Sequence, residues 1–265
     1  MNTGRLLEEF PLWVIVLGTE LLVLLAIVTG VYLGRFRKRP TAKDEDAPIG
    51  TVVGATLGLL AFILAFTFGM TASRFDMRKQ VFLDEVNAIE TTFLRAGLIP
   101  EPHRTEVRKL LKTYVAIRTD LARHPENVLP AIKRSDAIQS QLWPHATALA
   151  EADLKNPDIV ALFIDSLNEM FDLQTKRVTV GLYYRIPPVI WLALIAITLL
   201  SMVQVGYLFG KAEKTNWFSI VALSLAFAAV VVLIADLDRS GAGAKGMISM
   251  SPQPLFDLQE RLNHE

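Results

Sequence analysis

The sequence predicts an all-α membrane protein with four transmembrane helices and a helical bundle inserted between the second and third spans. Of the 265 residues, 52% are hydrophobic, which exceeds the roughly 45–50% that is usual in soluble domains. These residues are concentrated in four stretches, each long enough for the roughly 20 residues that cross a bilayer. By contrast, 16 of the 27 Lys and Arg and 15 of the 27 Asp and Glu lie in 74–185, between the second and third stretches.

The four spans are expected at about 12–34, 51–73, 187–209 and 216–236. The first is not expected to be a cleaved signal peptide, because its apolar core is long and the basic run 35–39 follows it. Glu20 is the one ionisable residue well inside a span. Because a carboxylate is costly in lipid, we expect Glu20 to be either an ion or proton site or a hydrogen-bonded structural residue.

Four regions follow along the chain: two spans in 1–73, a bundle in 74–185, two spans in 186–236, and a polar C-terminal tail in 237–265. No helix breaker separates the second span from the bundle, so one helix of about 70 Å is expected to end near Gly97. Prolines divide the rest of the bundle. Asn156 is placed to cap a helix that starts at Pro157, and Pro144 is expected to kink or divide a helix over 127–153.

The composition removes several classes of chemistry. The absence of cysteine excludes disulfides, thiolate metal sites and cysteine nucleophiles. The four histidines form no metal-ligand pattern, and no phosphate-binding or nucleophile motif occurs. We therefore predict no catalytic residues, metal or cofactor, and hence no enzyme. A net charge of zero gives no reason to expect nucleic acid, so the expected partners are the lipid bilayer, further copies of the chain and inorganic ions.

The second span has two distinct faces on a helical wheel. Small residues lie within about 60° of Gly54, namely Gly54, Gly58, Ala61, Ala65 and Gly69. Such a face lets helices approach closely in a membrane. A bulky strip adjoins it, made of Leu59, Phe62, Phe66 and Met70. This pattern predicts either a pore wall or simple packing inside the chain with the phenylalanines in lipid.

Charges of both signs follow where this helix leaves the bilayer. The candidate residues for an ion-attracting vestibule are Arg74, Arg78, Glu85, Asn87 and Arg95. Contacts with lipid headgroups and salt bridges between helices explain the same residues equally well.

Two stretches resemble the bestrophin-like family of bacterial membrane proteins. In "RFDMRKQVFLDEVNAIETTFLRAGLIPEPHR" the matching residues are Arg74, Arg78, Glu85, Asn87, Ala88, Ile89, Thr91, Leu94, Arg95 and Pro100, whereas Val86, Glu90 and Phe93 depart from the pattern. In "DLDRSGAGAKGMISMSPQPL" the matching residues are Asp236, Leu237, Asp238, Arg239 and Gly243, and Ser240 replaces a proline.

The resemblance implies a distant likeness to bestrophins, which are pentameric anion channels whose second span lines the pore. Their hydrophobic neck lies shortly before an Arg at the exit from the membrane. Here Leu59, Phe62 and Phe66 take the place of that neck and Arg74 that of the Arg. The leading hypothesis is thus a homo-oligomeric, pentameric ion channel, with anions preferred, in the bacterial inner membrane.

Two alternatives belong to other classes. One is a non-conducting membrane scaffold or signalling protein whose bundle binds a protein partner. The other is a transporter that uses Glu20 as a proton site, although no inverted repeat supports it. Counts of Lys and Arg near the spans do not decide on which side of the membrane the bundle lies.

Overall fold

The structure is a computed structural model that describes residues 11–36, 46–152, 156–212, 216–239 and 247–265. Within these ranges the regular secondary structure is helical and there is no strand. The chain divides into two compact units. The membrane unit comprises the described residues up to 73 together with 185–239 and 247–248, and the bundle unit comprises those of 74–184 and 249–265. Each unit is described by itself below.

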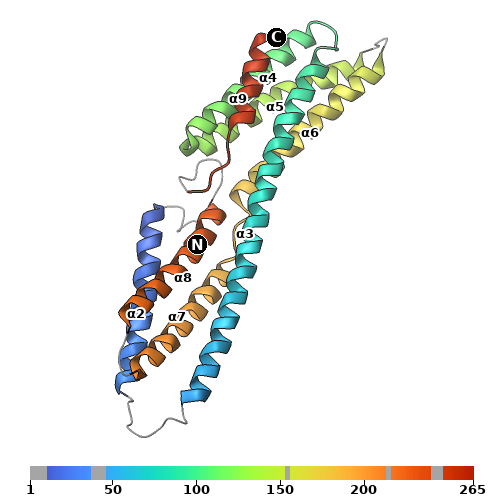
Figure 1. Cartoon of the computed structure of the whole chain (residues 1–265). Helices are drawn as coiled ribbons and strands as arrows, with labels where there is room; N and C mark the ends of the chain where they lie inside the picture. The colour runs from blue at the N-terminus through green and yellow to red at the C-terminus, as the bar shows by residue number, and fades with distance from the viewer. Residues whose placement is uncertain (1–10, 37–45, 153–155, 213–215, 240–246) are drawn as a thin grey trace. The chain divides into compact units, whose positions relative to one another are not determined.

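The membrane unit contains α2 (Leu12–Phe36), the first part of α3 (Asp46–Ala96), α7 (Pro188–Lys211) and α8 (Trp217–Arg239). Among the described residues, these four helices are long and apolar enough to cross a membrane, which confirms the four predicted apolar spans. Helix α2 packs against both α7 and α8 (Figure 1). Their shared core includes Ile27, Leu60, Leu194 and Ile220.

Helices α2 and α7 touch backbone to backbone through two pairs of glycines. Gly30 and Gly34 of α2 face Gly206 and Gly210 of α7. A Cβ atom on Gly30 would lie 2.0 Å from the carbonyl oxygen of Val203. Both pairs have the four-residue spacing that permits close helix packing in lipid. The tightest packing in the membrane unit therefore lies between the first and third spans, and not on the small-residue face of the second.

The bundle unit contains the second part of α3, α4 (His103–Arg123), a short 3₁₀ turn (Pro125–Asn127), α5 (Val128–Glu151), α6 (Pro157–Leu182) and α9 (Gln253–His264). Helix α4 packs against α5 and α9, and α5 packs against α6 (Figure 1). Apolar residues spaced three or four apart on each helix form one core, including Phe93, Leu111, Leu142, Phe163 and Leu258.

The structure tests two local predictions. Of the two effects expected of Pro144, division of the helix does not occur, because Pro144 lies inside α5. Buried residues continue at helical spacing on both sides, from Ile138 and Leu142 to Ala146 and Leu149, and their packing holds the two halves in one helix. Asn156 does occupy the N-cap position before Pro157, but its side chain makes no capping hydrogen bond.

The C-terminal segment, expected to be a polar tail, contains the amphipathic helix α9. Leu255, Leu258 and Leu262 are buried at a spacing of three and four residues. Arg261 of α9 donates two hydrogen bonds to the Glu90 carboxylate of α3, at 3.0 and 2.9 Å. A buried apolar stripe and a bidentate ion pair therefore attach the end of the chain to the bundle.

Candidate functional site

The face of α3 that carries the predicted neck is not covered by the described part of the chain. The side chains of Leu59, Phe62 and Phe66 are 50%, 68% and 62% exposed. On the neighbouring small face, a Cβ atom added to Gly54 or Gly58 would have no described atom within 4 Å. Helix α3 instead packs through its opposite face, where the buried residues are Val53, Leu60, Leu64, Thr67 and Thr71. Packing within the described chain therefore does not explain the small face.

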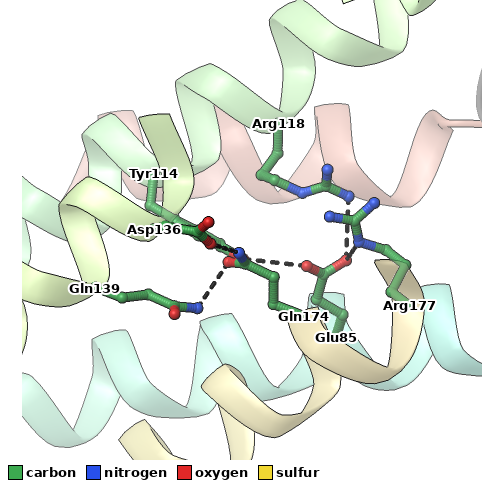
Figure 2. A network of polar contacts seen from close by, with 7 residues as sticks. All are labelled: Glu85, Tyr114, Arg118, Asp136, Gln139, Gln174 and Arg177. Carbon is green, nitrogen blue, oxygen red and sulfur yellow. Dashed lines mark hydrogen bonds and ion pairs between the residues drawn. The ribbon is translucent and has the colours of Figure 1, made fainter. Parts of the chain in front are cut away.

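Beyond residue 73, α3 reaches a buried polar network in the bundle unit (Figure 2). Glu85 of α3 is 1% exposed. Its Oε2 atom lies 3.1 Å from Nη2 of Arg118 on α4 and 2.8 Å from Nε of Arg177 on α6. Arg118 forms a hydrogen bond, whereas the Arg177 N–H is not directed at the oxygen, so that the second contact is an ion pair only. One carboxylate thus holds three helices together.

The network continues through Tyr114 of α4 to the surface of the bundle unit. The Tyr114 hydroxyl lies 3.1 Å from Oε1 of Glu85 and 2.7 Å from Oε1 of Gln174. Because a hydroxyl has one hydrogen, these two acceptors compete for it. Gln174 also accepts a hydrogen bond from Gln139 and donates one to the exposed Asp136, each at 2.7 Å. Figure 2 shows the whole chain of contacts from Asp136 to Arg177.

Burial and charge compete at the centre of this network. Burial alone would raise the pKa of Glu85, but the positive charges of Arg118 and Arg177 outweigh it and hold that pKa below its ordinary value of 4.5. Burial and the Glu85 charge raise the pKa of Tyr114, which keeps the hydroxyl a donor. Burial and the like charge of Arg177 lower the pKa of Arg118. The ionised carboxylate therefore stabilises two cations that would otherwise repel each other.

The structure gives the burial and contacts of the five residues that were expected at an ion-attracting vestibule. Glu85 and Arg78 are only 1% and 4% exposed, so neither side chain lies on the surface of the chain. Arg95 donates a hydrogen bond to the Leu162 carbonyl at 2.7 Å and joins α3 to α6. Asn87 is exposed and Arg74 is partly buried. For Glu85 and Arg95, these contacts favour the alternative stated above, salt bridges between helices.

The partners of Glu85 were not among the residues singled out from the sequence, although their positions carry a signal. Tyr114 and Arg118 lie on the same stripe of α4 as the buried Leu111 and Leu121. Gln174 similarly continues the buried stripe of α6 after Met170. A polar residue in the middle of an apolar stripe is a candidate for a buried network, because it has to find a partner inside the protein.

Glu20 lies between two helices of the membrane unit. Ser224 of α8 donates a hydrogen bond to Oε1 of Glu20 on α2 at 2.6 Å. No hydrogen-bond partner for the buried Oε2 atom is found among the described residues. The contact with Ser224 favours the structural alternative stated above, in which Glu20 helps to join two spans.

The residues of the tail motif form hydrogen bonds within the membrane unit. Asp236 and Asp238, at the end of α8, are 1% and 5% exposed. The Asp238 carboxylate accepts a hydrogen bond from the Ile186 backbone N–H at 3.0 Å, and Asp236 accepts one from that of Ile248 at 2.9 Å. Arg185 donates to the Asp238 carbonyl. Arg239 ends α8. The motif thus joins the end of α8 to the segments before α7 and after α8.

Two histidines far apart in the sequence meet in the bundle unit. The Nδ1 atoms of His103 on α4 and His145 on α5 lie 3.0 Å apart. One ring donates and the other accepts, which requires at least one of them to be neutral at that nitrogen. Burial and the neighbouring His103 lower the pKa of His145, while Glu106 opposes the shift. Within the described residues, no group of three His, Cys, Asp or Glu side chains is placed to hold a metal ion.

We expect the histidine pair to make the stability of the bundle unit sensitive to acid. Since the pKa of His145 is lower in the folded protein than its ordinary 6.5, the unfolded chain binds more protons and stability falls as pH drops below that value. We expect the thermal midpoint of the full chain in detergent to fall more between about pH 7.5 and about pH 5.5 than that of His145→Asn. His264→Gln, at an exposed position, is the control and should behave like wild type. An equal pH dependence in His145→Asn would contradict the prediction.

The four apolar spans and the helical bundle define an all-helical membrane protein. Its residues 21–247 match the family model of the Bestrophin-like domain. Because this match covers most of the sequence, the chain belongs to the bestrophin-like family. No curated protein matches the sequence.

Solved structures share the fold at low sequence identity. A bacterial bestrophin homologue from Klebsiella pneumoniae with an isoleucine-to-threonine mutation is 16% identical, with a TM-score of 0.65 over 96% of this chain and 100% of that chain. A tyrosine-to-alanine variant of a Klebsiella pneumoniae homologue is also 16% identical, with a TM-score of 0.68 over 94% of this chain and 98% of that chain. These comparisons extend the likeness over nearly the whole length of both proteins.

Proposed function

We propose that the protein is an ion-conducting homo-oligomer of the bacterial inner membrane, in which α3 of each copy lines a central path. The proposal rests on the uncovered face of α3. In the described chain, α2 packs against α7 and α8, and Leu60 and Leu64 on one side of α3 belong to the same core. The glycines and phenylalanines on its other side remain available. A second copy can approach closely over the small residues, because no side chain separates the helices there.

The bulky strip beside that face supplies a candidate neck. Leu59, Phe62 and Phe66 carry no polar group, and a ring of such side chains in an oligomer would gate ions by excluding water. A pentamer is the assembly expected from the bestrophin resemblance. Arg74 follows two turns after Phe66 on the same helix and is the candidate residue at the exit from the neck.

Truncation of the neck tests the proposal directly. We expect the variant Phe62→Ala/Phe66→Ala to raise ion flux in liposomes well above wild type, because a wider and less apolar constriction holds water more readily. Flux is measured with purified protein at equal reconstitution density. Phe218→Ala is a matched control, since Phe218 lies on α8 and is 81% exposed, and its flux should equal that of wild type.

The same preparations distinguish the proposal from its alternatives. Projection images in a membrane-like environment should show rings with a central axis. A monomer or dimer that passes neither chloride, sodium nor potassium would contradict the channel and would favour a scaffold whose bundle binds another protein. Rings whose conductance is unchanged by Phe62→Ala/Phe66→Ala would place the path away from this face of α3.

A further inference from the structure

An apolar groove opens between α3 and α7 of the membrane unit. Its volume is about 310 Å³, and pockets that bind small molecules have volumes from roughly 300 Å³ upward. Both helices contribute lining residues that belong to this unit, namely Ile49, Val52, Val53, Val203, Gln204 and Tyr207. Most of these side chains are aliphatic, so the groove favours an occupant with a hydrocarbon chain.

A basic residue lies at one end of the groove. Tyr207 and Lys211 are one turn apart on α7, and the Lys211 ammonium lies 5.8 Å from the centre of the Tyr207 ring. Lys211 is also the last residue of α7, a helix long and apolar enough to cross a membrane. The groove therefore extends from the hydrocarbon region toward a cation at the level of the lipid headgroups.

The connections at this end of the membrane unit are basic overall. Ranges 35–50 and 209–216 span the connections from α2 to α3 and from α7 to α8, and together they hold 7 Lys and Arg against 4 Asp and Glu. Basic residues next to membrane spans attract anionic lipids. An anionic headgroup therefore matches this end of the groove better than a zwitterionic one.

One polar group in the groove lacks a partner. The Oε1 atom of Gln204 is buried, and no hydrogen-bond partner for it is found among the described residues. An unpaired buried acceptor costs free energy until a donor binds it. Because the side chain of a helical residue leans toward the N-terminus of its helix, the Lys211 side chain approaches the level of Gln204. A headgroup that combines a phosphate with hydroxyl groups can therefore pair with both residues.

We infer that the groove binds one anionic phospholipid of the phosphatidylglycerol type. An acyl chain lies between α3 and α7, the phosphate pairs with Lys211, and a headgroup hydroxyl donates a hydrogen bond to Gln204. This inference goes beyond ion conduction and does not rest on it, because a single chain supplies all the lining residues of the groove.

The groove lies apart from the surface proposed for contact between copies. On the helical wheel of α3, Val53 and Ile49 are rotated by about 100° and about 140° from Gly54 of the small face. The same two residues are about 180° and about 140° from Phe62 of the neck. A second copy that packs over the small face therefore leaves the groove open to lipid.

The test is lipid binding to the full chain in detergent, counted by native mass spectrometry with dioleoyl phosphatidylglycerol or dioleoyl phosphatidylcholine as the probe. We expect one phosphatidylglycerol per chain, bound about fivefold more tightly than phosphatidylcholine, since one basic residue at a membrane surface favours anionic lipid by that factor. Lys211→Gln should reduce this ratio to near one. Lys133→Gln on the exposed surface of α5 is the control, and its ratio should equal that of wild type.

Two further variants test the groove itself. Ile49 is only partly buried, so Ile49→Trp adds a ring to the groove without opening the core, and it should weaken the binding of both lipids severalfold. The matched control is Ile195→Trp on α7, where the side chain is 43% exposed and does not line the groove. Gln204→Leu should weaken phosphatidylglycerol and leave phosphatidylcholine unchanged. Size-exclusion profiles that match wild type show that the variants are folded.

The outcomes separate this inference from the proposed function. A preference for phosphatidylglycerol that persists in Lys211→Gln, or lipid binding that is unchanged in Ile49→Trp, would overturn the inference. A wild-type protein that retains neither lipid would overturn it as well, and would favour a second copy of the chain as the occupant of the groove. A protein that binds the lipid but conducts no ions would instead overturn the proposed function and leave the lipid site standing.

Discussion

Replacing Glu85 by glutamine should lower the free energy of unfolding by about 3–5 kcal/mol, the cost of breaking a buried ion pair by removing one partner. The glutamine side chain has the same shape, so that no cavity forms. The substitution leaves Arg118 and Arg177 with like charges and no carboxylate between them. Arg118 is only 5% exposed, so its charge remains buried. Denaturant unfolding of the full chain in detergent, followed by the helical circular dichroism signal, measures the change.

The control for this variant is Glu169→Gln on the exposed surface of α6, which should change stability by no more than about 0.5 kcal/mol. A double-mutant cycle with Arg118→Gln should show strong coupling, because both changes disrupt one network. Additive effects of the two substitutions would mean that the ion pair does not stabilise the bundle. Wild type should also lose stability as pH falls below 4.5 through the lowered pKa of Glu85, and Glu85→Gln should lack this component.

The sequence predicted those parts of the fold that depend on residues close together in the chain. A run of residues without charge, such as 51–73, is a signal of a span because the bilayer excludes charge over about 20 residues. The continuation of α3 past the membrane followed from the absence of a breaker after the second span, and the structure ends the helix at Ala96, next to the expected Gly97. Pro157 similarly marked the start of α6. Each of these signals is local and needs no knowledge of partners.

The contacts that organise each unit were not predictable, since they join distant segments. His103 and His145 are 42 residues apart, and Glu85 and Arg118 are 33 apart. Helical spacing gave the face on which each residue lies but not the face that it meets. The charge on Arg118 also argued for the surface, whereas the carboxylate of Glu85 allows a guanidinium to lie in the core.

Helix α9 was not predicted from the sequence for a different reason. Only three buried leucines define it, at 255, 258 and 262, and the segment is polar on average. A short amphipathic helix gains little from its own hydrogen bonds, and its stability comes mainly from packing. Helix α9 packs against α4, whose buried residues recur at helical spacing, but that spacing does not show that α4 has a partner so far along the same chain.

The candidate neck also combines a feature predicted from the sequence with one that only the structure shows. Phe62 and Phe66 were selected from their spacing, and the structure adds that both side chains lie exposed on α3. The spacing placed both rings on one strip of α3, but the side of the helix that packs within the described chain was not predictable from it.

Substitution of Gly206 by alanine should prevent α2 and α7 from packing as they do. The new Cβ atom would lie 2.0 Å from the carbonyl oxygen of Ile27, and real Cβ atoms essentially never approach another atom closer than 3.0 Å. Because that oxygen belongs to the backbone of a helix, no side chain can rotate away and the two helices have to separate. We expect a loss of about 3 kcal/mol or more, at the upper end of the cost of overpacking a core.

Gly18→Ala is the matched control, because the same methyl group on α2 meets no described atom within 4 Å. It should leave stability unchanged or slightly improved, since alanine favours a helix over glycine by about 1 kcal/mol. Thermal unfolding and monodispersity of the full chain in detergent measure both variants. A Gly206→Ala protein as stable as Gly18→Ala would show that α2 and α7 do not touch through their glycines. An unstable Gly206→Ala beside a stable Gly18→Ala would locate the effect in this contact, because both substitutions add the same atom to an apolar span.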